Sequence, residues 1–224
     1  MRSLKLLLFL TPIFLLAFSS SAQEYDFFYF VQQWPRSFCN TNQGCCYPTY
    51  GKPPSDFGIH GLWPNYNNSS YPTYCDPNNT FDINEVQGLV FSLRAKWPSL
   101  KCPRSDSSRF WQLQWMKHGT CSVLSQSDYF SAALQLKAVT NILQCLQLAG
   151  IWPDDRRYTT LTSVVSAIQN CVGHTIYVQC NRDIRGRHQL YQVYICVNQT
   201  GTGLIDCPVF PTRTCPSSFR FPKF

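Results

Sequence analysis

Long apolar runs are missing from the chain after its first 22 residues. The one such run, Leu6 to Phe18, follows a basic start, and the small residues Ser20 and Ala22 then fit a cleavage site. This order is typical of a secretory signal peptide. No later segment approaches the ~20 apolar residues of a membrane-spanning helix. We therefore expect residues 1–22 to be a signal peptide and residues 23–224 to form one secreted, monomeric domain without a membrane contact.

Three further patterns are absent. No low-complexity linker or internal repeat divides the chain, which favours a single domain. No Cys-x-x-Cys pair with matching histidines occurs, so we expect neither a zinc site nor another metal or cofactor. No Gly-x-Ser-x-Gly turn occurs, which argues against a serine hydrolase.

Histidine is scarce, with four residues, whereas cysteine is abundant, with twelve. An even cysteine count in a secreted chain indicates a disulfide framework. Basic residues outnumber acidic ones by 19 to 12, which suits a polyanionic partner but is equally common in secreted proteins that bind none. Four Asn-x-Ser/Thr sequons in turn-rich segments are expected glycosylation sites: Asn67, Asn68, Asn78 and Asn198.

Apolar patterns predict strands near both ends of the domain. Residues Asp26 to Trp34 read as a buried strand and Phe57 to Trp63 as a second one, before a surface loop that reaches Asn79. Near the C-terminus the period is two residues again, which predicts three more strands: Thr175–Asn181, Leu190–Val197 and Leu204–Cys207.

The middle of the chain has helical spacing instead. A capping-box-like Asp82 and Glu85 begin a first predicted helix, which Pro98 stops, and Ser107 or Ser108 could cap a second helix that Gly119 ends. The four predicted helices are Asp82–Trp97, Arg109–His118, Ser127–Gln147 and Leu161–Val172. Helices and antiparallel strands come in separate runs, so an α+β domain is expected.

Two histidines lie in aromatic segments, His60 in Phe57–Pro64 and His118 in Phe110–Cys121. On a helix, Gln114, Lys117 and His118 would share one face. Two imidazoles can serve as base and acid at mild pH, and a cation can stabilise charge on a phosphorane. Metal-free RNA cleavage needs this set of groups. The alternative, that both are structural histidines in apolar stretches, remains open at this level.

Two motifs give the chain a specific resemblance. His60-Gly61-Leu62-Trp63-Pro64 and Trp115-Met116-Lys117-His118-Gly119-Thr120-Cys121 resemble, in the right order, the two signatures of the T2 family of ribonucleases, and the whole domain is similar to secreted S-like plant members. The resemblance implies an α+β fold with a central antiparallel sheet. It also implies endonucleolytic cleavage of single-stranded RNA, and not DNA, through a 2′,3′-cyclic phosphate.

The resemblance also implies roles for single residues. His118 would be the general base, His60 the general acid and Lys117 a stabiliser of the pentacovalent phosphate. Gln33, Trp63 and Phe110 fall where relatives contact bases, and aromatic stacking suits the last two, although both could equally be core residues.

The chain departs from its relatives just before the second signature. They usually have His-Glu-Trp where this chain has Leu113-Gln114-Trp115. Gln114 can donate a hydrogen bond to a phosphoryl oxygen but cannot take up a proton, and Leu113 can do neither. We therefore expect a ribonuclease of reduced activity. The alternative is a catalytically idle relative used in storage, defence or recognition, which has no physical need to keep both histidines.

By the same resemblance the cysteines pair in a defined way. The family-like pairs are Cys39–Cys45, Cys46–Cys102, Cys75–Cys121, Cys180–Cys215 and Cys196–Cys207. Cys145 and Cys171 remain, and we expect them to form an extra bridge between the third and fourth predicted helices, within the ~7 Å Cα separation that a disulfide allows.

The signal peptide is compatible with secretion out of the cell and with delivery to a vacuole, and the sequence does not separate the two.

Overall fold

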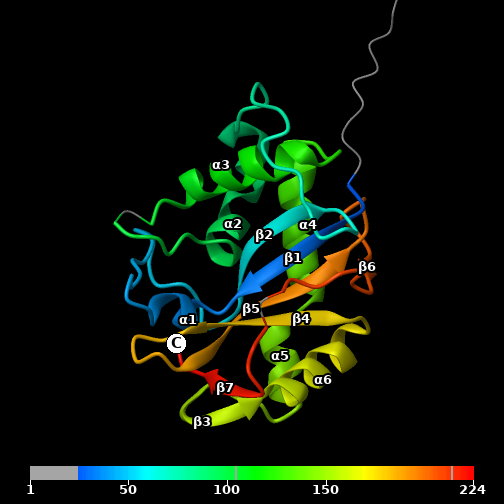
Figure 1. Cartoon of the computed structure of the whole chain (residues 1–224). Helices are drawn as coiled ribbons and strands as arrows, with labels where there is room; N and C mark the ends of the chain where they lie inside the picture. The colour runs from blue at the N-terminus through cyan, green and yellow to red at the C-terminus, as the bar shows by residue number, and fades with distance from the viewer. Residues whose placement is uncertain (1–24, 104, 213) are drawn as a thin grey trace, which may run out of the picture.

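The computed structural model describes residues 25–103, 105–212 and 214–224, and the expected signal peptide lies outside the described residues. Within them, seven strands form one sheet organised around β5 (Figure 1). β5 pairs antiparallel with β1, β4 and β6, and parallel with β7. The strands are β1 (Phe27–Gln33), β2 (Gly58–Asn65), β3 (Asp154–Thr160), β4 (Ile176–Arg182), β5 (His188–Val197), β6 (Leu204–Ile205) and β7 (Ser218–Phe221).

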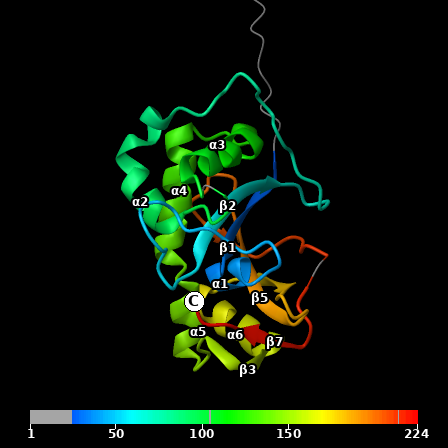
Figure 2. The ribbon, with the colours of Figure 1, turned by 90° about the vertical axis from the view of Figure 1, so that its left-hand side faces the viewer.

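Helices supply the rest of the α+β fold, and none of those described is long and apolar enough to cross a membrane. In Figure 2, α2, α3 and α4 lie together on one side of β1 and β2. The helices are α1 (Pro35–Cys39), α2 (Val90–Lys96), α3 (Ser107–Lys117), α4 (Gln126–Val139), α5 (Ile142–Leu148) and α6 (Leu161–Val172), with 3₁₀ segments η1 (Ile83–Leu89) and η2 (Gly119–Cys121).

Strand β1 is buried along its whole length because both faces of the sheet are covered. Phe28 and Phe30 point into the main core beneath the helices. Phe27, Tyr29 and Val31 point the other way, into a smaller aromatic cluster. Successive side chains of a strand point to opposite faces, so the apolar residues of β1 contribute alternately to the main core and to the aromatic cluster.

Two predicted helices differ from those observed. The segment after Asp82 begins as the 3₁₀ segment η1: the side chain of Asp82 accepts a hydrogen bond from the N–H of Asn84 at 2.9 Å, and its backbone carbonyl accepts one from the N–H of Glu85 at 3.2 Å, three residues on. The helix predicted over 127–147 is two helices. Gln32 on β1 donates to both the carbonyl and the hydroxyl oxygen of Thr140, at 3.0 and 2.9 Å, and Asn141 caps α5. A distant strand therefore ends α4.

Three elements were not predicted: α1, β3 and β7. β3 reads Asp-Asp-Arg-Arg-Tyr-Thr-Thr and is mostly exposed, so it has no apolar alternation to indicate a strand. It forms by pairing with β7 at the sheet edge. The parallel pairing of β7 with β5 also makes the sheet mixed, where an antiparallel sheet was expected.

Three of the four asparagines expected as glycosylation sites lie on the surface. Asn67, Asn68 and Asn78 are exposed, as an acceptor for glycosylation needs to be. Asn198 is half-buried, and its Oδ1 accepts hydrogen bonds from Thr200, Thr202 and Gly203, so its side chain is part of the turn.

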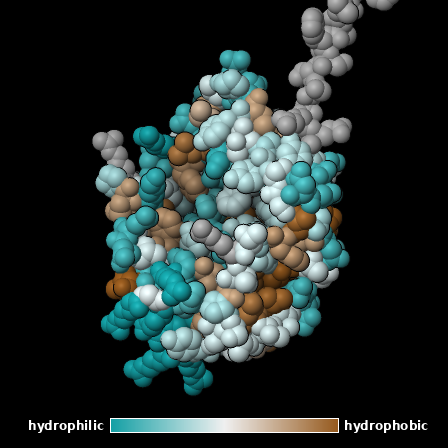
Figure 3. All heavy atoms as spheres, viewed as in Figure 1, coloured by the Kyte–Doolittle hydropathy of each residue, from teal (hydrophilic) through white to brown (hydrophobic). Residues whose placement is uncertain are grey.

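The β4–β5 turn is a charged loop. It lies on the side of the molecule where Figure 3 shows hydrophilic surface at the lower left. Arg182 and Arg185 are exposed there, while Arg187 pairs with Asp183 at 2.8 Å.

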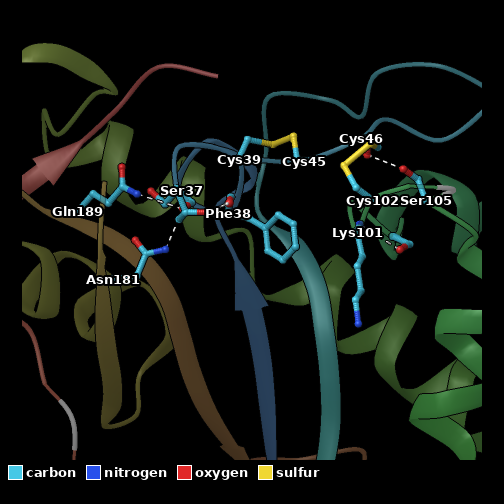
Figure 4. Close-up of a disulfide and its surroundings, with 12 residues drawn as sticks. Ser37, Phe38, Cys39, Cys45, Cys46, Lys101, Cys102, Ser105, Asn181 and Gln189 are labelled. Carbon is cyan, nitrogen blue, oxygen red and sulfur yellow. Dashed lines mark hydrogen bonds between the residues drawn. A yellow bond between two sulfur atoms is a disulfide. The ribbon is translucent and has the colours of Figure 1, made fainter. Parts of the chain in front are cut away.

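All six expected disulfides are present in the expected pairing. Cys39–Cys45 follows α1, whose Ser37 carbonyl accepts hydrogen bonds from Asn181 and Gln189 of the β4–β5 hairpin (Figure 4). Cys145–Cys171 joins α5 to α6 with a Cα separation of 5.6 Å, as predicted for the extra bridge.

Replacing both Cys145 and Cys171 by alanine is expected to lower the free energy of unfolding by about 3 kcal/mol. The bridge closes a loop with a sequence separation of 26 residues, and opening a loop of that size restores chain entropy to the unfolded state. Urea unfolding of the double variant measures the change. Because the bridge lies outside both cavities described below, kcat should stay unchanged, and unaltered stability would contradict the prediction.

Candidate active site

Helix α3 carries the second histidine at its C-terminal end. Its N-cap is Asp106, whose side chain accepts a hydrogen bond from the N–H of Arg109 at 3.1 Å. The expected serine cap is therefore wrong: Ser107 is the first helical residue. A carboxylate at this position also complements the helix dipole. The helix ends at Lys117, and His118 is its C-cap residue.

Two tryptophans decide which face of α3 looks outward. Trp111 and Trp115 are buried, and each indole N–H donates to a backbone carbonyl, at 2.8 and 3.1 Å. Gly119 starts η2 instead of ending the helix in a left-handed conformation. A Cβ at Gly119 would lie 2.1 Å from a ring carbon of Trp115, so glycine is needed here for packing.

Strand β2 brings His60 to the same place from the other side. Ile59 and Leu62 are fully buried, and the carbonyl of His60 accepts a hydrogen bond from the indole of Trp97 at 3.2 Å. The imidazole of His60 thereby lines a cavity of about 390 Å³. The same cavity is lined by Trp63, Gln114, Lys117, His118 and Tyr194.

Trp63 orders these groups. Its ring stacks on His118, with centroids 5.3 Å apart and planes at 26°, and meets His60 edge-on at 5.0 Å. Its Nε1–H donates to Oε1 of Gln114 at 3.0 Å. A Cβ at Gly61 would lie 1.9 Å from that Nε1, so the glycine of the first signature makes room for this bond.

Both imidazoles favour the neutral form. Burial, and then the charge of Lys117, lower the pKa of His60 to about 4. Burial, Lys117 and His60, in that order, lower the pKa of His118 to about 3. A neutral imidazole in the free protein is a competent base. A protonated one persists only in acid or beside a bound anion.

We expect an acidic optimum from these shifts. The reaction needs a neutral His118 and a protonated His60, so kcat/KM, which reports the free protein, should peak between about pH 3 and pH 4 and fall above it. The limbs of the kcat profile should lie at higher pH, because a bound phosphate favours imidazolium. Initial rates from pH 3 to 8 measure both profiles, and a kcat/KM optimum near neutrality would contradict the assignment.

A second cavity, of about 580 Å³, lies on the other side of His60, which lines both. Gln33 and Phe110 line this second cavity, as do Lys101 and Arg109. The side-chain oxygen of Gln33 is buried without a hydrogen-bond partner among the described residues. Two cavities that meet at His60 and carry aromatic and basic side chains suit a ligand with two ring systems joined by a negatively charged group.

Leu113 and Gln114, where the chain was expected to depart from its relatives, lie on different sides of His60. Gln114 is 8 % exposed and lines the first cavity, whereas Leu113 is 48 % exposed and lines the second. The structure therefore gathers every predicted site residue around the two cavities: His60, Trp63, Gln114, Lys117 and His118 at the first, and Gln33 and Phe110 at the second.

Sequence reasoning missed Gln192 and Tyr194 of β5. The amide nitrogen of Gln192 lies 2.5 Å from Nδ1 of His60, and Tyr194 lines the first cavity. The available signal was a glutamine between aromatic and apolar residues of a predicted strand, since a buried polar group needs a partner. No group of three or more His, Cys, Asp or Glu residues that could hold a metal ion occurs in the described part of the chain.

Known proteins are similar to this chain in sequence and in fold. The model of the ribonuclease T2 family matches residues 25–207. Extracellular ribonuclease LE of Solanum lycopersicum is 51% identical over 208 residues, 92% of this chain and 90% of its own length. Intracellular ribonuclease LX of the same plant is 49% identical over 211 residues, 94% of this chain and 89% of its own length.

Solved structures agree. RNase NT in complex with 5′-AMP is 51% identical and superposes with a TM-score of 0.88 over 90% of this chain and 100% of its own. The family match over residues 25–207 includes both signature stretches. The chain belongs to the ribonuclease T2 family.

Proposed function

We propose that the protein is a secreted endoribonuclease that cleaves single-stranded RNA by transphosphorylation. The observation that carries this proposal is the placement of two imidazoles, His60 and His118, around Trp63 in one cavity with Lys117 beside them. Such a set supplies a base, an acid and a cation, which suffice for the reaction without a metal. The RNase NT complex with 5′-AMP supports a nucleotide as the occupant.

The reaction has two proton transfers in its first step. Neutral His118 takes the proton of the ribose 2′-hydroxyl as the 2′-oxygen forms a bond to phosphorus. The bond from phosphorus to the 5′-oxygen breaks, and protonated His60 donates a proton to that oxygen. Lys117 stabilises the charge on the pentacovalent phosphate. The products are a 2′,3′-cyclic phosphate and a free 5′-hydroxyl, and DNA is excluded because it has no 2′-hydroxyl.

The two cavities can hold the bases on either side of the cleaved bond. Trp63 and Tyr194 offer aromatic surfaces in the first cavity, and Phe110 and Gln33 offer a ring and an amide side chain in the second. Stacking on aromatic side chains and hydrogen bonds to base edges are the usual ways to hold single-stranded RNA. Two such sites favour cleavage inside a strand.

The second candidate is a ribonuclease-like protein without activity, used in storage, defence or recognition. It is favoured by Leu113 and Gln114, which replace two groups that can carry a proton. The two histidines favour the enzyme. Both line the cavity, His118 is buried and His60 half-buried, and the pKa of each is lowered.

Incubation of the purified protein with a short RNA tests the proposal. The expected products carry 2′,3′-cyclic phosphate ends, and a substrate with one deoxyribose at the cleaved position should stay intact there. A His118→Ala protein measures the background from contaminating nucleases. Cleavage no greater than that background would favour the idle alternative.

A further inference from the structure

Behind His60 lies a row of three glutamines that crosses the sheet. Gln192 on β5 is paired in register with Gln33 on β1 and with Gln179 on β4. Residues directly opposite on neighbouring strands point to the same face. Gln192 is only 3 % exposed, so its amide must find partners within the protein.

The amide of Gln192 is held at both ends. Its nitrogen lies 2.5 Å from Nδ1 of His60, and its oxygen lies 2.9 Å from the hydroxyl of Tyr194. The same hydroxyl lies 3.1 Å from Oε1 of Gln179. Burial raises the pKa of Tyr194, so the phenol keeps its proton at any pH where the protein works.

Resting on the function proposed above, we propose that Gln192 is a positioning residue for His60: it binds Nδ1 from behind and leaves Nε2 to exchange the proton with the departing 5′-oxygen. An imidazole with one nitrogen engaged by the protein presents the other one in a fixed direction and tautomer. His60 and Gln192 are 132 residues apart in sequence, and only the sheet register brings them together.

The number of protons in the network indicates which amide atom faces His60 during turnover. Tyr194 has one hydroxyl proton but two carbonyl oxygens as neighbours, so one of these goes without it. A half-turn of the Gln192 amide exchanges its nitrogen and oxygen. The nitrogen then donates to the Tyr194 hydroxyl, and that hydroxyl donates to Oε1 of Gln179. The oxygen of Gln192 accepts a hydrogen bond from the protonated Nδ1 of His60. Every partner is then satisfied, and His60 is the imidazolium that an acid must be.

This arrangement also persists through the proton transfer. After Nε2 gives up its proton, Nδ1 still donates to the amide oxygen, and no group in the network has to move. The charged or basic groups that line the two cavities with His60 are Lys117 and His118 at the end of α3, and Lys101, Arg109 and Asp106 at the second cavity. The four basic groups disfavour a positive charge on His60 when protonated, and the carboxylate of Asp106, which caps the start of α3, favours one. Gln192 is the group that contacts the ring nitrogen directly.

The direct test is the titration of the His60 ring protons, followed by NMR in the complete mature protein. Gln192→Glu should raise the pKa of His60 by about two units, because a carboxylate favours the imidazolium. Gln192→Leu, of similar size, should lower it. An identical His60 titration in wild type and both variants would overturn the proposal whether or not the protein cleaves RNA.

Kinetics separate positioning from mere structure. Gln192→Leu should lower kcat by about 10- to 100-fold with little change in KM, and should move the alkaline limb of the pH profile to lower pH. Gln192→Glu should move that limb upward. A uniform loss of activity without movement of the limb would contradict the proposal. If the ring titrations shift as expected but wild type cleaves no RNA, the proposed function fails and the positioning role stands.

A milder pair of variants guards against misfolding. Tyr194→Phe keeps the ring and removes the hydroxyl that orients the amide, so it should shift the His60 titration in the same direction as Gln192→Leu. Tyr177→Phe is the matched control, because Tyr177 packs edge-on against Tyr194 at 5.6 Å but lies outside these hydrogen bonds. Equal titrations in the two variants would count against the role of Tyr194 in the network.

Discussion

Replacing His118 by alanine should reduce kcat/KM by about 10³-fold, because general-base catalysis by a positioned imidazole contributes that order of rate. His118 is buried, and its ring stacks on Trp63. Alanine would therefore leave a hole as well as remove the base. Steady-state cleavage of a dinucleotide substrate at the acidic optimum measures the loss.

Two further variants separate chemistry from packing. His118→Phe keeps an aromatic ring against Trp63 but cannot accept a proton, so it should be as inactive as the alanine variant. His174→Ala is the matched control, since His174 pairs with Asp206 at 3.6 Å, outside both cavities. It should retain wild-type rates. Activity in the phenylalanine variant would show that His118 is not the base.

Introducing a carboxylate at Gln114 and an imidazole at Leu113, just before the second signature, should raise activity by about 10²-fold. Gln114→Glu places a carboxylate beside His60, Lys117 and His118, and this carboxylate can still accept the hydrogen bond from Trp63. Leu113→His adds a phosphate-binding group at the second cavity. One positioned polar group at a transition state is typically worth ~10² or more in rate, so the double variant should exceed either single one in kcat.

The pH dependence gives an independent measure of the same change. A carboxylate favours both imidazolium ions, so Gln114→Glu should raise both histidine pKa values and move the whole profile to higher pH. Gln112→Glu is the matched control, because Gln112 is exposed on α3 and lines neither cavity. An unchanged rate and profile in Gln114→Glu would mean that Gln114 does not limit the reaction.

The low rate expected of the wild-type protein has its physical reason at Gln114. Oε1 of Gln114 accepts the hydrogen bond from Trp63, so its amide nitrogen remains to donate to a phosphoryl oxygen. This keeps the aromatic geometry around both histidines without a third group that titrates. The replacement therefore preserves the shape of the site while removing part of its proton chemistry.

Short-range patterns were sufficient for much of the molecule. The apolar spacing of Leu161–Val172 gave the bounds of α6 as observed. The two signatures placed His60, Lys117 and His118 correctly at one cavity, because each signature carries its own packing: Gly61 makes room for Trp63, and Gly119 for Trp115. Five cysteine pairs followed from the resemblance, the sixth from the two cysteines left over in predicted helices, and all six agree with the structure.

Contacts between distant segments decided the rest. The sequence by itself determined the family, the candidate acid and base, and most helices and strands, since these depend on neighbours a few residues apart. The tertiary structure alone decided where α4 ends, through the amide of Gln32, and that β3 is a strand. It also set Gln192 behind His60. Such pairings depend on sheet register, which no local pattern of side chains encodes.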